Sequence, residues 1–255
     1  MRRPLVALST ATSLALALAL TLGSPRTAHA CGAAYPGGPV MCDFPRAAAA
    51  PPPIVRISAS YAFASTTLLF GEGRRADLTR HAVFGAVQLP LTSSGALSLQ
   101  FGAGGIAAGE LVHGSSRDTM GPGFAAFTGI AGRVVDGRGA LPVVQLTATF
   151  SATHAITHAS ASSETPRFTA FDLRAGVIAS KTIADVFTPY VTARVFGGPV
   201  YWRLDGADVT GTDLYKYQLG GGLSLALFQR KLDVFIEGVP LGERGVAAGI
   251  GTTFF

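Results

Sequence analysis

Long segments that alternate apolar residues with small or polar ones constrain this chain more than any other feature. The alternation runs through residues 55–63, 97–102, 144–153 and 218–227. Successive side chains of a β-strand point to opposite faces, so each segment has one apolar face and one small or polar face. The pattern predicts an all-β fold built from amphipathic strands.

A soluble β-sandwich would show the same alternation, but two properties of the segments weigh against it. They run for about 10 residues or more, whereas sandwich strands usually have about 5 or 6. Their polar faces carry Gly, Ser, Thr and Gln with few charges, which suits a crowded interior better than a solvated surface. We therefore expect a transmembrane antiparallel up-and-down β-barrel, with a secreted soluble β-sandwich as the alternative. Lipid offers no hydrogen bonds, so a spanning sheet must close on itself.

The turn signals between the segments divide the body of the chain into about ten strands. The expected strands lie near residues 54–66, 79–91, 96–109, 123–134, 142–154, 167–180, 187–202, 213–228, 232–240 and 245–255. Long polar connections alternate with tight turns along this series, which is typical of an outer-membrane meander with turns in the periplasm and loops outside. Eight or twelve strands would follow if one hairpin is misassigned.

The N-terminus has the three parts of a secretory signal peptide. Residues 1–3 are basic at two positions, residues 5–22 are mostly Leu, Ala, Ser and Thr, and residues 28–30 are Ala-His-Ala. We expect residues 1–30 to be removed, with cleavage between Ala30 and Cys31, because the apolar run is short for a membrane anchor of about 20 residues. Lipidation of Cys31 is the less favoured alternative, since alanine and histidine stand where the lipid-attachment pattern has leucine and a small residue.

Residues 31–53 are rich in Gly, Pro and Ala, as is typical of an extended linker. They contain Cys31 and Cys42, the two cysteines of the chain, which could form a disulfide in an oxidising compartment. The absence of a nearby histidine and of a C-x-x-C spacing argues against a metal site or redox catalysis. The folded body is expected at residues 54–255, as one domain.

The positive net charge belongs largely to the leader. The whole chain has 20 basic and 15 acidic residues, a formal charge of +5. Removing Arg2, Arg3 and Arg26 leaves 17 against 15, or +2. The remaining cations are scattered and form no stripe, so nothing points to a nucleic-acid partner.

The chain closes on two phenylalanines, Phe254 and Phe255. A C-terminal aromatic on the last strand resembles the assembly signal of bacterial outer-membrane barrels. Together with the leader and the alternating body, it makes the chain resemble a small outer-membrane β-barrel protein of a Gram-negative bacterium, at the level of architecture and of no single family. The resemblance implies an outer-membrane location, with membrane lipid and the barrel-assembly machinery as partners. Phe255 is the residue assigned to this signal, although the apolar face of the last strand, with Val246 and Ile250, is in phase with Phe254.

Two groups of side chains follow from the barrel hypothesis. Aromatic residues near strand ends are expected to form a membrane-interface girdle. They are Tyr61, Phe63, Tyr190, Tyr201, Trp202, Tyr215 and Tyr217. Charged residues on the polar faces are expected to point inward and to form a network of ion pairs that fills the lumen. They are Arg56, Asp172, Arg174, Arg194, Lys216, Asp233 and Glu237. The alternative is a narrow polar path for a small solute, lined by Arg174, Arg194 and Glu237.

No motif assigns a catalytic residue, a cofactor or a metal. The glycine-rich stretch at residues 102–105 is not followed by a helix that could hold a phosphate. Several histidines and serines near the outer strand ends could supply a Ser/His pair, but no spacing joins a nucleophile to a base. They are His81, His113, His154, His158, Ser160, Ser162 and Ser163, with Glu164 nearby. We therefore expect a non-enzymatic barrel with a structural, surface-recognition or limited solute-passage role. The rival is a loop-rim hydrolase acting on lipid or peptide.

Overall fold

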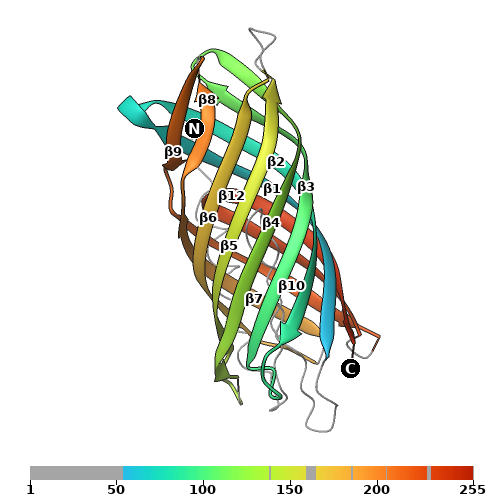
Figure 1. Ribbon diagram of the computed structural model, residues 1–255. Helices are drawn as coiled ribbons and strands as arrows, with labels where there is room; N and C mark the ends of the chain where they lie inside the picture. Colours follow the sequence, from blue (N-terminus) through green and yellow to red (C-terminus); the bar gives the residue numbers. More distant parts are fainter. Residues whose placement is uncertain are drawn as a thin grey trace, which may run out of the picture.

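Twelve antiparallel strands form one sheet that closes on itself as a barrel (Figure 1). The computed structural model describes residues 54–137, 139–158, 165–184, 186–204, 206–228 and 231–254. The strands are β1 (Val55–Phe70), β2 (Arg75–Pro90), β3 (Leu97–His113), β4 (Ser116–Asp136), β5 (Val143–His158), β6 (Arg167–Ser180), β7 (Phe187–Gly197), β8 (Val200–Leu204), β9 (Ala207–Asp213), β10 (Tyr217–Leu227), β11 (Leu232–Gly242) and β12 (Arg244–Phe254). β12 pairs with β1 and so closes a ring of ten strands, β1 to β7 followed by β10 to β12.

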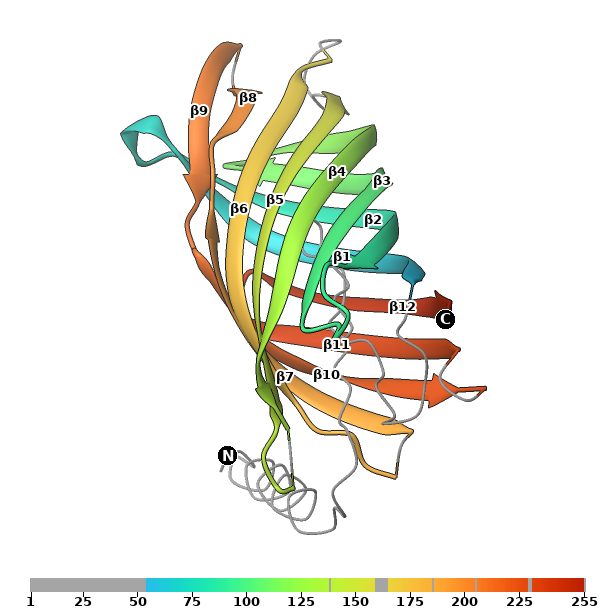
Figure 2. The same cartoon turned by 60° about the horizontal axis from the view of Figure 1, so that its bottom comes forward.

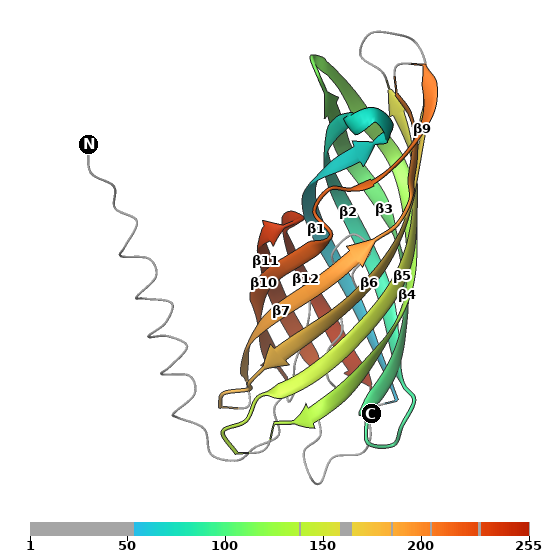
Figure 3. The same cartoon turned by 90° about the vertical axis from the view of Figure 1, so that its left-hand side faces the viewer.

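The wall of this ring has an uneven height. Strands β1 to β6 have 14 to 21 residues, whereas β7, β10, β11 and β12 have 11 each. The β8–β9 hairpin stands above the short strands, where β8 pairs with β6 and β9 pairs with β1 (Figures 2 and 3). The barrel therefore narrows from ten strands to eight. We call the ten-stranded part, where β1 begins and β12 ends, the terminal barrel, and the eight-stranded part the distal barrel.

The barrel narrows because strand structure is interrupted at two bends. β7 ends at Gly197, and after Gly198 and Pro199 the chain continues as β8. A side chain at position 198 would put its Cβ 1.9 Å from the carbonyl oxygen of Phe171 on β6, so the close approach at the bend requires glycine. The return passes through residues 214–216, which separate β9 from β10. One long hairpin is thus bent, with its lower half in the ten-stranded ring and its upper half in the eight-stranded ring.

The two parts of the barrel have opposite polarity. In the terminal barrel the outward face carries a belt of exposed apolar residues, which we call the apolar belt. It includes Ile57, Val83, Phe101, Ile130, Leu146, Val191, Ile236 and Val246. The buried inward positions of the terminal barrel are mostly polar. Buried inward residues there include Arg56, Ser58, Ser60, Gln88, Ser98, Gln100, Gln145 and Thr149. In the distal barrel the buried residues form an apolar core, made of Leu68, Phe70, Leu78, Ile106, Leu111, Met120, Phe168, Val200, Trp202 and Leu204 with smaller neighbours. The same cluster continues toward the terminal barrel through Phe84 and Phe127. The outward positions at this level are mostly polar, as at Arg75 and Asp77 on β2, with Ile156 on β5 and Tyr201 on β8 as exceptions.

The strands agree with the expected all-β barrel of about ten strands, but the connections differ. The first connection is shorter than the predicted gap between residues 66 and 79, because β1 continues to Phe70 and β2 begins at Arg75, with Ala76 and Leu78 filling the distal core. The connection predicted between residues 109 and 123 is shorter too, because β3 continues to His113 and β4 begins at Ser116. What remains is the three-residue 3-10 helix η1 (Gly71–Gly73) and a two-residue turn after His113. Among the described residues no helix has the length and apolar character needed to cross a membrane. The leader, the linker with Cys31 and Cys42, and Phe255 lie outside the described residues.

Candidate functional site

A cluster of charged side chains occupies the lumen where the ring narrows from ten strands to eight. Its members come from β2, β6, β7, β9, β10, β11 and the turn between β11 and β12. They are Arg80, Asp172, Arg174, Arg194, Asp213, Gln218, Glu237 and Glu243. Three guanidinium groups face four carboxyl groups, so the lumen at this level is nearly balanced in charge. We call this set the lumen cluster.

The lower part of the lumen cluster is an ion pair between two strands, β7 and β11, that are separated by β10. Arg194 on β7 donates to both carboxylate oxygens of Glu237 on β11, at 2.7 and 3.1 Å. The Gln218 side chain on β10, between these strands, accepts from Arg194 at 3.4 Å. Both charged side chains are almost inaccessible, so each is satisfied by its partner and not by bulk water.

Glu243 joins the lower part of the lumen cluster to its upper part. It lies in the turn after Gly242, whose φ of +83° is the left-handed conformation that favours glycine. Its buried carboxylate accepts from Gln218 at 2.7 Å and from Arg80 at 3.1 Å, and it pairs with Arg174 at 2.8 Å. Because Arg80, Arg174 and Gln218 belong to β2, β6 and β10, the β11–β12 turn is tied to three separate parts of the wall.

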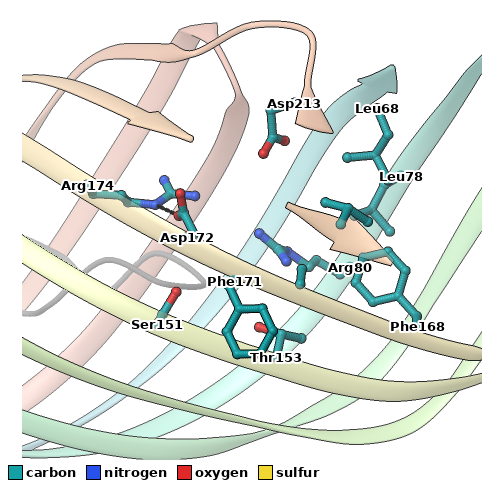
Figure 4. A pocket seen from close by; sticks show the side chains of 12 residues that line it. Leu68, Leu78, Arg80, Ser151, Thr153, Phe168, Phe171, Asp172, Arg174 and Asp213 are labelled. Carbon is teal, nitrogen blue, oxygen red and sulfur yellow. Dashed lines mark hydrogen bonds and ion pairs between the residues drawn. The ribbon is translucent and has the colours of Figure 1, made fainter. Parts of the chain in front are cut away.

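The upper part of the lumen cluster borders a small cavity beneath the distal core (Figure 4). Arg174 contacts Asp172, and Arg80 and Asp213 approach from the other side. The cavity has a volume of about 20 Å³, which is room for one water molecule. Its lining also includes Leu68 of the distal core.

Asp213 ends β9, which belongs to the distal barrel above the apolar belt. Burial, reinforced by the negative charge of Glu243, raises the pKa of Asp213 to about 6. Arg174 and Arg80 act in the opposite direction with smaller effect. The Thr66 hydroxyl donates to the Asp213 carboxyl at 3.1 Å.

A second ion pair lies at the terminal end of the lumen, apart from the lumen cluster. Arg56, near the start of β1, contacts Asp233 near the start of β11, and both side chains are buried. The Arg56 guanidinium lies over Gly251 on β12, where a Cβ would collide with it. The pair therefore spans the strands on both sides of the closing seam.

The structure brings most of the predicted lumen charges together and places one elsewhere. Arg56, Asp172, Arg174, Arg194, Asp233 and Glu237 are inward, whereas Lys216 is exposed at the bend between β9 and β10. The sequence prediction missed Arg80, Asp213, Gln218 and Glu243. The alternation on β2, where Arg80 shares a face with Phe84, carried enough signal to place that residue.

Two of the predicted girdle aromatics are wrong. Tyr190 is only 4% exposed and Trp202 only 2%, so both lie inside the barrel. Tyr190 faces the small residue Gly222, and Trp202 belongs to the distal core, which explains why an interior position accepts each ring. The other five predicted girdle residues, Tyr61, Phe63, Tyr201, Tyr215 and Tyr217, face outward, and of these Phe63 is partly buried.

The histidines considered for catalysis do not converge. His81 lies on the outer wall, with Nδ1 2.6 Å from the Tyr61 hydroxyl. His154 is on β5, with Nδ1 2.9 Å from the Thr169 hydroxyl. His158 is exposed at the end of β5. Each belongs to a local contact between neighbouring strands. Ser160, Ser162, Ser163 and Glu164 lie outside the described residues.

His113 is the exception, because it sits at the inner rim of the distal barrel. Its Nε2 lies 3.7 Å from Asp118, and its ring packs edge-on against Trp202 with centroids 5.5 Å apart. The Trp202 indole donates to the Thr157 hydroxyl at 3.1 Å. The His113 side chain is thus part of the packing that closes the distal end.

Comparison with solved structures identifies the architecture. The outer membrane protease OmpT from Escherichia coli matches with a TM-score of 0.51 at 10% identity, over 80% of this chain and 97% of that one. The chain has the fold of an outer-membrane β-barrel. The translocator domain of the autotransporter NalP from Neisseria meningitidis also matches, with a TM-score of 0.44 at 11% identity, over 78% of this chain and 88% of that one. No protein-family model and no curated protein sequence matches this barrel.

Proposed function

We propose that this barrel resides in an outer membrane, does not conduct, and holds its distal barrel at the cell surface in a structural and recognition role. The outer-membrane fold and the apolar belt of the terminal barrel support the location. The polar outward face of the distal barrel supports its projection into water. The closed lumen is the observation that carries the non-conducting role.

The lumen is blocked in two successive ways. The lumen cluster fills the level where the ring narrows, with Glu237 and Glu243 fully buried. Above it, Leu68, Phe168 and Trp202 are each at most 2% exposed within the distal core. An ion that entered would have to lose its hydration inside an apolar core, which costs several kcal/mol or more. A solute path along Arg174, Arg194 and Glu237 is therefore disfavoured.

Planar-bilayer recording tests the closed lumen. We expect the reconstituted protein to insert without discrete conductance steps. The variant Phe168→Ala/Trp202→Ala removes two rings from the block and should produce small, frequent steps, provided that unboiled samples still show heat-modifiable migration on gels. Discrete steps in the unchanged protein would contradict the proposal.

Cysteine labelling on intact cells tests the orientation. Ser115 is exposed in the distal turn between β3 and β4, and Ser93 is exposed in the turn between β2 and β3 at the terminal end. With a membrane-impermeant maleimide, Ser115→Cys should react on intact cells, and Ser93→Cys only after the cells are opened. The unchanged chain is the control for Cys31 and Cys42. Reaction of Ser93→Cys on intact cells would reverse the orientation.

The proposed role needs no catalytic group, so turnover assays separate it from the hydrolase alternative. We expect no cleavage of lipid A or of peptides by the folded barrel. Turnover that is lost in His113→Ala, or in His154→Ala or His158→Ala, would overturn the non-enzymatic role.

A further inference from the structure

The outer surface has a shoulder at the point where the ring narrows. It is formed by Tyr215, Lys216 and Tyr217 at the bend between β9 and β10, together with Arg244 at the start of β12. Tyr215 and Tyr217 are 46% and 44% exposed, and both cations are exposed. We refer to these four residues as the shoulder.

Backbone contacts bring the shoulder residues together. The carbonyl of Lys216 accepts from the amide of Phe196 on β7, and the carbonyl of Tyr217 accepts from Glu243, the residue before Arg244. Arg244 pairs with Ser65 on β1, and the neighbouring Thr67 accepts from Leu214, the residue before Tyr215. Lys216 therefore lies between the two tyrosines along the chain, and Arg244 lies on the adjoining piece of wall, next to the residue that pairs with Tyr217.

The side chains of the shoulder lie on the outside of the wall. The Lys216 stem runs over Gly197, with its Cδ 3.8 Å from where a Cβ would stand. Gly197 lies two residues after Val195 on β7, so it shares the outward face with Val195, which is 62% exposed. Arg244 is in phase along β12 with the exposed Val246. An exposed lysine whose aliphatic stem lies against the wall is suited to snorkelling, in which the stem covers apolar surface and the ammonium stays in water.

The charge of the shoulder is not neutralised by the wall around it. On the described strands β7, β10, β11 and β12 and the turn between the last two, the acidic residues are Asp233, Glu237 and Glu243, and all three are buried in the lumen. Neither Lys216 nor Arg244 forms an ion pair with another described residue. The acidic residue of β2, Asp77, accepts from the Thr67 hydroxyl at 2.7 Å.

We propose that the shoulder binds the phosphate headgroup of an anionic lipid in the membrane leaflet at the distal end. Lys216 and Arg244 supply charge-assisted hydrogen bonds to the phosphate oxygens, and the tyrosines provide amphipathic rings at the headgroup level. Below them the apolar belt, with the highly exposed Leu173 and Val195, receives the acyl chains. The inference shares the membrane location with the proposed function and is independent of conductance.

Native mass spectrometry of the full mature barrel tests the site. The protein is released from vesicles of phosphatidylcholine alone or of equal parts phosphatidylcholine and phosphatidylglycerol, and bound lipids are counted. We expect retained phosphatidylglycerol in preference to phosphatidylcholine. Each cation near a charged headgroup contributes about a fivefold preference, so Lys216→Gln/Arg244→Gln should lower the preference about thirtyfold.

Two matched variants make the result specific. Arg75→Gln/Arg203→Gln removes two exposed cations from the distal barrel and should leave the preference for phosphatidylglycerol unchanged. Lys216→Arg/Arg244→Lys keeps both charges of the shoulder and should also leave this preference unchanged. Heat-modifiable migration verifies that each variant is folded. Equal losses in the shoulder variant and the distal variant would overturn the proposal, as would retained selectivity in Lys216→Gln/Arg244→Gln. Displacement of the lipid by millimolar inorganic phosphate alone would also overturn it, because the acyl chains would then contribute nothing.

Discussion

At the scale of single residues, the lumen contains ion pairs in which both charged partners are buried. A buried ion pair is an ambiguous source of stability, because the loss of hydration opposes the attraction between the partners. What the pair of Arg194 and Glu237 certainly does is make each partner dependent on the other, since both are almost inaccessible. The same dependence links Glu243 to Arg80 and Arg174.

Removing one partner should therefore cost more than removing both. Arg194→Met should lower the free energy of unfolding by about 3–5 kcal/mol, because it leaves Glu237 buried without its guanidinium. Arg194→Met/Glu237→Leu should recover most of that loss. Urea unfolding in lipid vesicles measures both. A double variant no more stable than the single one would show that the pair is not the dominant interaction.

Asp213 should make stability depend on pH. Its pKa is raised to about 6, whereas an unfolded aspartate ionises near 4, so the folded state loses stability as pH rises from about 4 to about 6. Asp213→Asn removes this loss and still accepts from Thr66. We expect the variant to be more stable than the unchanged protein above pH 6, by on the order of 3 kcal/mol, and equal to it below pH 4.

Unfolding temperatures at a series of pH values check this expectation. The charged groups that face Asp213, namely Glu243, Asp172, Arg174 and Arg80, stay in place in the variant. Parallel pH profiles of the two proteins would contradict the assignment of the titration to Asp213.

At the scale of elements, the sequence predicted the strands better than the bends between them. A period of two is visible without tertiary information. Alternation located the ten wall strands to within about five residues at each end, except that β4 begins at Ser116, seven residues before its predicted start. It joined β7 to β8 across Gly198 and Pro199, since the alternation resumes after the break. The bend depends on the approach of β6, a contact between strands that local sequence does not encode.

Gly198→Ala should damage this bend. The added Cβ would meet the Phe171 carbonyl at 1.9 Å, a backbone atom that cannot rotate away. We expect a loss of about 2 kcal/mol or more in unfolding free energy. Gly238→Ala on β11 is the matched control, because nothing lies within 4 Å of its Cβ position, and it should change stability by less than about 0.5 kcal/mol. Equal losses of unfolding free energy in Gly198→Ala and Gly238→Ala would show that the close contact at the bend does not determine the effect.

At the scale of the whole molecule, the reversal of polarity is what the sequence could not reveal. Alternation states that two faces differ, but it does not state which face meets lipid, water or the interior. Tyr190 and Trp202 were placed on the outer girdle for this reason, since an aromatic ring suits an apolar belt and an apolar core equally well. The lumen cluster was found only in part, because Glu243 lies in a turn and Asp213 at a strand end, where alternation stops.

Adjacent residues of β2 test the reversal. Leu78 is 2% exposed in the distal core, whereas Thr79 faces outward at the same level. Leu78→Asn should cost about 3 kcal/mol or more, from lost apolar burial and a buried amide, and Thr79→Asn should stay within about 0.5 kcal/mol. Urea unfolding of the two variants decides this, and a comparable loss in both would show that the distal barrel has no apolar core.

The opposite polarity of the two halves also guards the strand register. A slip of one residue along β1 turns every side chain to the other face. In the terminal barrel that slip would move Arg56 out of the lumen and into the apolar surroundings of the belt. In the same movement it would take Leu68 and Phe70 from the distal core into water. Because each long strand meets both environments, a single register error costs free energy twice. It places a charge in apolar surroundings at one end of the strand and apolar side chains in water at the other.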